Sequence, residues 1–252
     1  MEQYLYRYIS FESFVDIIQR RSLTFVLPSL WEDTYELIAY KERFKRLDNA
    51  IEIALFLSSL NLIYAQCWSK LGESDAMWRI YSNSNMAVRL KVKRSSFSLL
   101  ENIEVRDVIY TNDYEKEIKK TVLNKDILQL LAVKRKAFAH EKEVRVIDYY
   151  RFSNEDAQDK VTKMLIMFND EMRHQYLEKN KDLDLNRFVE EAVSGTNLNR
   201  KVRTKSISFD CIQDFICDVM LHPMAPEWYE RTVSTFCSLN GIKFLGKSKL
   251  YN

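Results

Sequence analysis

Residues 4–27 read YLYRYISFESFVDIIQRRSLTFVL, a stretch that predicts a strand, a helix and a second strand in immediate succession. Aromatic and aliphatic residues dominate Tyr4–Ile9 and Leu23–Leu27, and this composition favours extended structure in both segments. Ser10 lies between them, where its hydroxyl can accept a hydrogen bond from the first turn of a helix. The spacing predicts that this helix carries apolar side chains on one face, at Phe11, Phe14, Val15 and Ile18.

Helical and extended patterns alternate along the rest of the chain. Further strands are expected at Tyr64–Ser69, Met86–Val92, Ile103–Tyr110, Glu143–Tyr150, Val161–Phe168, Lys201–Phe209, Phe215–Leu221 and Ile242–Leu245. Helices are expected at Tyr35–Leu62, Ala76–Tyr81, Asp113–Ala139, Asp170–Val193 and Pro226–Leu239. No proline-rich or serine-rich linker divides these elements, so we expect a single α+β domain over residues 1–252.

The composition is that of a globular protein with a large core. The chain has 252 residues, of which 46% are hydrophobic, and its net charge of +2 is too small to imply general attraction to nucleic acid or to a membrane. The first residues, MEQYLYRYIS, lack the pattern of a signal peptide, and no apolar run reaches the roughly 18 residues of a membrane span. We therefore expect a cytoplasmic protein with no membrane partner.

Common cofactor and metal motifs are excluded. The four glycines cannot form the GxGxxG fingerprint of a Rossmann domain, and the four cysteines and three histidines lack zinc-ligand spacing, so we expect no metal. Residues 241–248 do match the P-loop pattern GxxxxGKS. Only four residues follow, too few for the phosphate-binding helix, so this segment predicts a helix-capping glycine and a last strand.

Three segments carry residues suited to binding or catalysis. Tyr6-Arg7-Tyr8 places an arginine inside an apolar strand, where its guanidinium needs either a structural carboxylate or an anionic ligand. Cys67-Trp68-Ser69 ends another strand with a hydroxyl. Trp78 and Tyr81 follow in a short helix, and by default they are core aromatics.

The third segment is HEKEVRV at residues 140–146. In an extended chain Glu141, Glu143 and Arg145 would point to one face, with the two valines on the other. A carboxylate placed at a cleft can stabilise a developing oxocarbenium ion on a sugar while its neighbour orients an acceptor. The alternative is an exposed edge strand with a local ion pair.

Taken in order, these segments resemble a known superfamily. The quoted pieces are Leu5-Tyr6-Arg7-Tyr8, Leu23–Asp33 with Tyr35-Glu36, Cys67-Trp68-Ser69 with Met77-Trp78 and Tyr81, Glu141–Arg145, and Lys247–Tyr251. Together they resemble a bacterial family of unknown function in the ADP-ribosyltransferase-like superfamily, of the Arg–Ser–Glu type. The resemblance covers nearly the whole chain.

The resemblance implies a split β-sheet core with surrounding helices, and NAD bound as a substrate in the cleft. Arg7 would hold an NAD phosphate or ribose, with Tyr6 beside it. Ser69 would support the nicotinamide ribose and the glutamate, and Trp78 or Tyr81 would stack on nicotinamide. Glu143 would stabilise the cation, and Glu141 would orient the acceptor.

The implied activity is transfer of ADP-ribose to a protein or nucleic acid, as in a toxin or a phage-defence effector, with an antitoxin as a further partner. Two alternatives stay open: an NAD glycohydrolase without an acceptor, and a non-catalytic module that binds a nucleotide or protein. The basic stretches Arg89–Arg94, Lys134–Lys136 and Arg200–Lys205 leave room for a nucleic-acid acceptor, but they equally suit solvated surface.

Overall fold

A computed structural model of the protein describes residues 2–31, 33, 63–123, 127–149, 178 and 203–251. The helices expected at Tyr35–Leu62 and Asp170–Val193 and the extended segment expected at Val161–Phe168 lie outside these residues, apart from Glu178, which is helical.

The N-terminal unit has the predicted form. Strand β1 (Tyr4–Ser10) runs directly into helix α1 (Phe11–Arg20), and strand β2 (Ser22–Val26) follows. The Ser10 hydroxyl accepts a hydrogen bond of 3.2 Å from the backbone N–H of Ser13, which confirms the predicted cap. The apolar face of α1 is buried in the main core through Phe14, Ile17 and Ile18.

Nine of the described strands form one sheet. Besides β1 and β2 they are β3 (Ile63–Ser69), β4 (Ala87–Lys93), β5 (Ile103–Asp107), β8 (Glu143–Tyr149), β9 (Thr204–Ser208), β10 (Ile216–Leu221) and β11 (Phe244–Lys247). Their order is β11-β10-β4-β1-β3-β2-β9, with β8 bonded to β3 and β5 bonded to β8. This arrangement confirms the α+β class.

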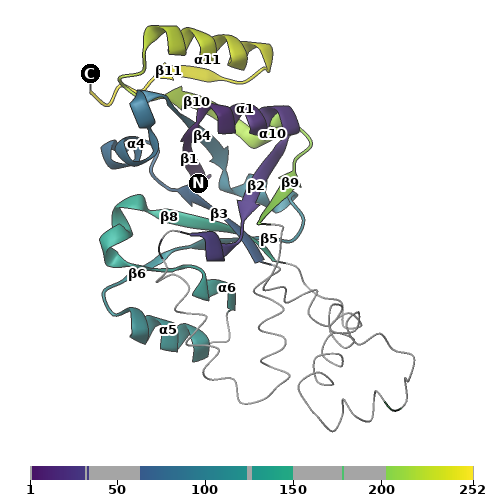
Figure 1. The fold of residues 1–252 in the computed structure, drawn as a ribbon, viewed down its shortest axis with the longest axis vertical. Coiled ribbons are helices and arrows are strands. Elements are labelled where there is room, and N and C mark those ends of the chain that lie inside the picture. The colour runs from purple at the N-terminus through teal and green to yellow at the C-terminus, as the bar shows by residue number, and fades with distance from the viewer. Residues whose placement is uncertain are drawn as a thin grey trace.

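The sheet is divided at β3. Tyr6 with Ser69 is the one registered pair that joins β1 to β3, and Val26 with Ala65 is the one that joins β2 to β3. By contrast, β1 pairs with β4, and β3 with β8, along whole strands. Figure 1 shows the result: β10, β4 and β1 occupy the upper half of the described part, and β3, β8 and β5 the lower half.

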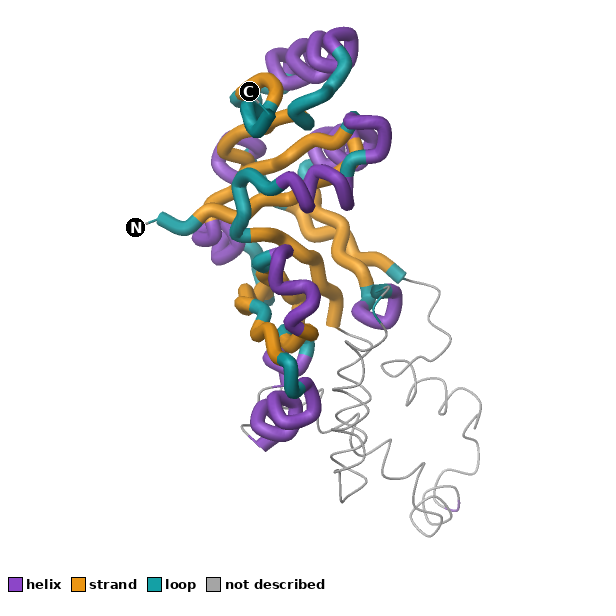
Figure 2. The backbone as a smooth tube through the Cα atoms, turned by 90° about the vertical axis from the view of Figure 1, so that its left-hand side faces the viewer, coloured by secondary structure: helices purple, strands orange, loops and turns teal. Residues whose placement is uncertain are grey.

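The helices lie around these strands. They are α4 (Asp75–Tyr81), α5 (Tyr114–Leu123), α6 (Ile127–Leu130), α10 (Ile212–Phe215) and α11 (Glu227–Leu239). Short 3-10 turns are η1 (Pro28–Leu30), η3 (Asn83–Asn85), η4 (Arg94–Leu99) and η5 (Lys136–Glu141). Figure 2 shows helices at the top and bottom of the described part, with strands between them.

Two predicted elements are wrong in extent. The helix expected at Asp113–Ala139 is broken into α5, α6, strand β7 (Val133–Arg135) and η5. Strand β7 pairs in parallel with β6 (Ile109–Thr111), so the strand expected at Ile103–Tyr110 is itself divided into β5 and β6. Val133 is 0% exposed, and the gain from burying it in the β6–β7 pair outweighs the helical pattern of the local sequence.

The P-loop match at residues 241–248 has the predicted form. Gly241 follows α11 with φ of 66°, a left-handed conformation that glycine adopts without strain, and β11 comes next. Lys247 lies at the end of β11 and pairs with Glu230 at 3.4 Å. Among the described residues no helix begins at Lys247-Ser248, so the phosphate-binding geometry is not formed there. None of the helices described here is long and apolar enough to span a membrane.

Candidate functional site

Three strands bring the predicted motifs together. On the sheet, β1, β3 and β8 are neighbours, with Tyr6 opposite Ser69 and Ser69 opposite Glu143. Residues directly opposite each other on antiparallel strands point to the same face. Tyr6, Ser69 and Glu143, which are far apart in the sequence, therefore lie in one row across the point where the sheet divides.

Glu143 is held as a buried, charged carboxylate. It is 5% exposed, and its Oε1 accepts from Arg145 Nε at 2.9 Å while its Oε2 accepts from Lys134 Nζ at 3.0 Å. Burial alone would raise the pKa of Glu143, but the charges of Arg145 and Lys134 and a hydrogen bond from Arg145 lower it from 4.5 to about 2. The carboxylate is therefore ionised at neutral pH.

Glu141 reaches the same ammonium by a different route. It is the last residue of η5, before the left-handed Lys142 (φ 45°), and it lies outside β8. The expectation that Glu141 and Glu143 share one extended strand is therefore wrong. Lys134 Nζ nonetheless bonds Glu141 Oε2 at 2.7 Å, so one buried ammonium holds both carboxylates.

The two cations are themselves fixed by aromatic rings and backbone. The guanidinium of Arg145 lies 4.1 Å from the ring centroid of Trp31, and its Nη1 donates to the carbonyl of Leu131. The ammonium of Lys134 lies 4.7 Å from the ring centroid of Phe138. The charges of this cluster are thus preorganised and shielded from water.

Ser69 supports the backbone beside the glutamates. Its hydroxyl donates to the carbonyl of Glu141 at 2.6 Å and accepts from the N–H of Leu71 at 3.0 Å, and the residue is 2% exposed. The hydroxyl fixes the turn that carries Glu141, and within the described residues it makes no hydrogen bond to the Glu143 carboxylate.

Arg7 lies on the other face of β1. Because successive side chains alternate along a strand, Arg7 faces away from Tyr6, and its guanidinium carbon is 6.0 Å from the ring centroid of Trp68. Burial lowers the pKa of Arg7 to about 10, against opposing electrostatic effects of Cys67 and Tyr81. Within the described part of the chain Arg7 makes no ion pair, so the structural carboxylate partner that its sequence position allowed is not seen there.

The three predicted aromatics have different environments. Tyr6 packs against Gly72, where an added Cβ would lie 2.9 Å from Tyr6 Cζ. Tyr81 ends α4 and is 44% exposed, and burial of its hydroxyl together with the nearby Glu141 charge raises its pKa to about 12. Trp78 is 0% exposed, and its ring packs edge-on against Tyr8 with 4.7 Å between the ring centroids. Because no ring surface of Trp78 is accessible, the expectation that it stacks on a ligand is wrong.

Sequence reasoning missed two members of the cluster. Lys134 stood in a basic stretch expected to be solvated or nucleic-acid binding, but it is 8% exposed and bonded to both glutamates. Tyr110 hydroxyl accepts the N–H of Glu143 at 2.7 Å. Neither residue had a local sequence signal, because each is brought in by β7 and β6, which the sequence did not predict as a pair.

Two arginines of the basic stretch Arg89–Arg94 are also engaged internally. Arg89 is 4% exposed and pairs with Asp218 at 3.1 Å, and Arg94 pairs with Asp107 at 2.6 Å. These two guanidinium groups are therefore committed to ion pairs, whereas Lys93 of the same stretch is exposed and makes no ion pair in the described residues. In the described residues no group of three or more His, Cys, Asp or Glu side chains is arranged to hold a metal ion.

Comparison with known proteins gives one family match. A model for a protein of unknown function (DUF2971) matches residues 77–146. The matched segment runs from α4 into β8, so it contains Tyr81, Lys134, Glu141 and Glu143 but neither Arg7 nor Ser69. No curated protein and no solved structure matched the chain.

Proposed function

We propose that the protein is an NAD-dependent ADP-ribosyltransferase that acts at the junction of β1, β3 and β8. The observation that carries the proposal is the row formed by Tyr6, Ser69 and Glu143, one residue from each of the three strands. The resemblance to the Arg–Ser–Glu type of the ADP-ribosyltransferase-like superfamily requires these strands to be neighbours at a division in the sheet. The single registered pair between β1 and β3 fits that requirement.

Glu143 has the charge state that the reaction needs. When the bond between nicotinamide nitrogen and ribose carbon breaks, its electron pair leaves with nicotinamide and positive charge develops on the ribose. A fixed carboxylate beside an adjacent hydroxyl lowers that barrier. With a pKa of about 2, Glu143 stays ionised, and a carboxylate has more lone-pair sites than its bonds to Lys134 and Arg145 occupy.

Glu141 and Arg7 take the other roles in this proposal. Glu141 would accept the proton of the incoming acceptor as its oxygen or nitrogen bonds to the ribose carbon. Arg7 would bind an NAD phosphate, since it is a partly buried guanidinium with no ion pair in the described residues. The ladder of backbone hydrogen bonds between β1 and β3 stops after one residue pair, so no continuous sheet lies between Arg7 and Tyr81. Tyr81 would stack on nicotinamide.

A second candidate is a non-catalytic module that binds a nucleotide at the same junction. Two observations favour it: Ser69 uses its hydroxyl on local backbone, and both oxygens of Glu143 already accept from cations. Under this alternative the cluster is a structural brace, and Arg7 alone recruits the ligand.

The decisive measurement is nicotinamide release from NAD by the purified protein, followed by labelling of acceptors in a cell extract with labelled NAD. Transfer requires both signals, an NAD glycohydrolase gives only nicotinamide, and the binding module gives neither while still binding NAD. A protein that neither binds nor cleaves NAD would overturn the proposal.

Two glutamate variants locate the chemistry. Glu143→Gln should lower NAD cleavage by about 10² to 10³, the usual cost of removing one preorganised electrostatic group. Glu141→Gln should suppress transfer and spare much of the hydrolysis. Glu227→Gln is the matched control, because its side chain is 86% exposed on α11.

Because Glu143→Gln also leaves two buried cations with one carboxylate, its fold must be checked by circular dichroism. Glu143→Asp provides a second variant. It keeps the negative charge, but its side chain is one methylene shorter, so the carboxylate lies farther from the ribose. Wild-type cleavage by both folded variants would contradict the catalytic role of Glu143.

A further inference from the structure

Strand β9 ends the sheet with an open edge. It pairs with β2 on one side through five registered residues, from Ser22 with Ser208 to Val26 with Thr204. No other described strand bonds to β9. An open strand edge presents backbone donors and acceptors that a further strand can use.

The backbone pattern shows which groups face that open edge. Phe209 donates its N–H to the carbonyl of Arg21 at 2.9 Å, and the carbonyl of Arg203 accepts from Leu27 at 3.2 Å. In an antiparallel ladder the residues that bond to a given neighbour alternate with residues that point away from it. Ser206 and Ser208 therefore direct their N–H and C=O groups away from β2.

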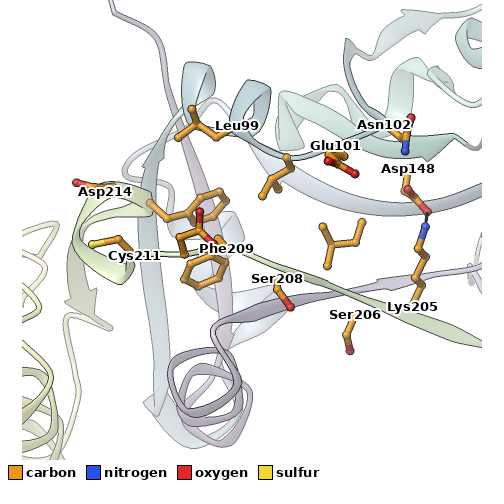
Figure 3. A pocket seen from close by; sticks show the side chains of 14 residues that line it. Leu99, Glu101, Asn102, Asp148, Lys205, Ser206, Ser208, Phe209, Cys211 and Asp214 are labelled. Atoms are coloured by element: carbon orange, nitrogen blue, oxygen red, sulfur yellow. Dashed lines mark hydrogen bonds and ion pairs between the residues drawn. The ribbon is translucent and has the colours of Figure 1, made fainter.

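A cavity of about 580 Å³ runs beside this strand. Figure 3 shows it between β9 and the turn that carries Leu99, Glu101 and Asn102. Every residue from Lys205 to Asp210 lines the cavity. Because neighbouring side chains of a strand point in opposite directions, such continuous lining indicates that the cavity follows the strand edge as well as one of its faces.

The cavity has an apolar floor and an acidic rim. Phe209 and Phe215 are buried in its floor, where their rings are stacked with 4.7 Å between the ring centroids. Glu101, Asp210 and Asp214 are exposed at its rim, and none of the three makes an ion pair in the described residues.

The other two charged residues that line the cavity, Asp148 and Lys205, form an ion pair with each other. Asp148 is 1% exposed and pairs with Lys205 at 2.7 Å. In the described part of the chain the rim therefore carries three negative charges without an ion pair, beside backbone groups of β9 that no described strand bonds. A ligand with basic side chains on an extended backbone satisfies both features.

We propose that the edge of β9 binds an extended basic peptide segment of a partner protein, which adds to the sheet as a further strand. Its backbone would bond Ser206 and Ser208, its alternate apolar side chains would reach the floor, and its lysine or arginine side chains would face Glu101, Asp210 and Asp214.

This surface is separate from the glutamate cluster. Asp148 is five residues beyond Glu143 on β8, about 17 Å along the strand, and alternation turns it to the opposite face. The proposal therefore does not depend on NAD chemistry, and its test requires no enzymatic activity.

The test uses three labelled peptides of about six residues, the length of an average strand. The first alternates lysine with valine, the second alternates lysine with proline and so has equal charge but fewer backbone donors, and the third alternates glutamate with valine. Fluorescence anisotropy with the whole protein should show saturable binding of the first peptide alone. Equal binding of the proline peptide would reduce the effect to charge and overturn strand addition.

Variants of the edge give the matched comparison. Ser206→Pro removes an N–H that points away from β2, so it should spare the sheet and weaken binding about tenfold. Ser206→Ala keeps that N–H and should bind as the wild type does. If Ser206→Pro fails to fold, Asp210→Lys with Asp214→Lys should abolish binding of the lysine–valine peptide and admit the glutamate–valine peptide.

Hydrogen exchange provides an independent readout. The amides of Ser206 and Ser208 should exchange more slowly when the lysine–valine peptide is bound. Absence of binding at millimolar peptide, or binding without protection of these amides, would overturn the proposal.

Discussion

Lys134→Met should destabilise the protein strongly, because it removes the ammonium shared by two carboxylates. Lys134 is 8% exposed, and its Nζ lies 2.7 Å from Glu141 Oε2 and 3.0 Å from Glu143 Oε2. Removing one partner of a buried ion pair commonly costs about 3–5 kcal/mol. Glu143 keeps its bond to Arg145, and Glu141 is partly exposed, so we expect a loss near the lower end, about 3 kcal/mol.

The pH dependence of this loss has a defined sign. The folded-state pKa of Glu143, about 2, is below its ordinary 4.5, so the ionised carboxylate stabilises the fold above about pH 4.5. That contribution disappears as pH falls towards 2. The difference in unfolding free energy between wild type and Lys134→Met should therefore be constant near neutrality and shrink below about pH 4.5.

Urea unfolding followed by circular dichroism at pH 7 and at pH 4 and below measures both effects. Lys120→Met is the control, since Lys120 is 69% exposed and its pair with Glu117 at 3.5 Å should contribute less than about 1 kcal/mol. If Lys134→Met costs no more than Lys120→Met, or if its cost does not depend on pH, the buried bridge between the glutamates is not formed in solution.

Three further changes test other parts of the structure. Arg7→Ala should weaken NAD binding with little change in melting temperature, and a large fall in melting temperature with unaltered affinity would instead show a structural role. Gly72→Ala should destabilise by about 1 kcal/mol, because its Cβ would lie 2.9 Å from Tyr6 Cζ and the tip of the Tyr6 ring must shift. Denaturant unfolding that matches wild type would contradict this packing. Ser248→Ala should lower the free energy of unfolding by about 1 kcal/mol, because it removes the 2.7 Å hydrogen bond from the Ser248 hydroxyl to Glu73. It should not change ATP affinity in equilibrium dialysis. Micromolar ATP binding by the wild type that is lost in this variant would restore the P-loop interpretation.

The local sequence determined most of the elements. The order of apolar residues in 4–27 predicted β1, α1 and β2, and Ser10 predicted the start of the helix correctly. Patterns of this kind succeed because periodicity and capping depend on neighbours within a few residues. The same local reasoning identified Glu143 and Arg145 as side chains of one strand face, and the structure joins them at 2.9 Å.

Only the tertiary structure decided how the charges are paired. Lys134 reaches the glutamates because β7 forms beside β6 in place of the helix that the sequence favoured. Trp78 of helix α4 is buried because Tyr8 from β1 and His222, the residue that follows β10, pack against its ring. Arg7 comes near Cys67 and Tyr81, which also interact with Glu143, because the ladder between β1 and β3 stops after one registered residue pair. Register and burial arise from contacts between segments distant in sequence, and their free energies exceed the small local preferences that a sequence pattern records.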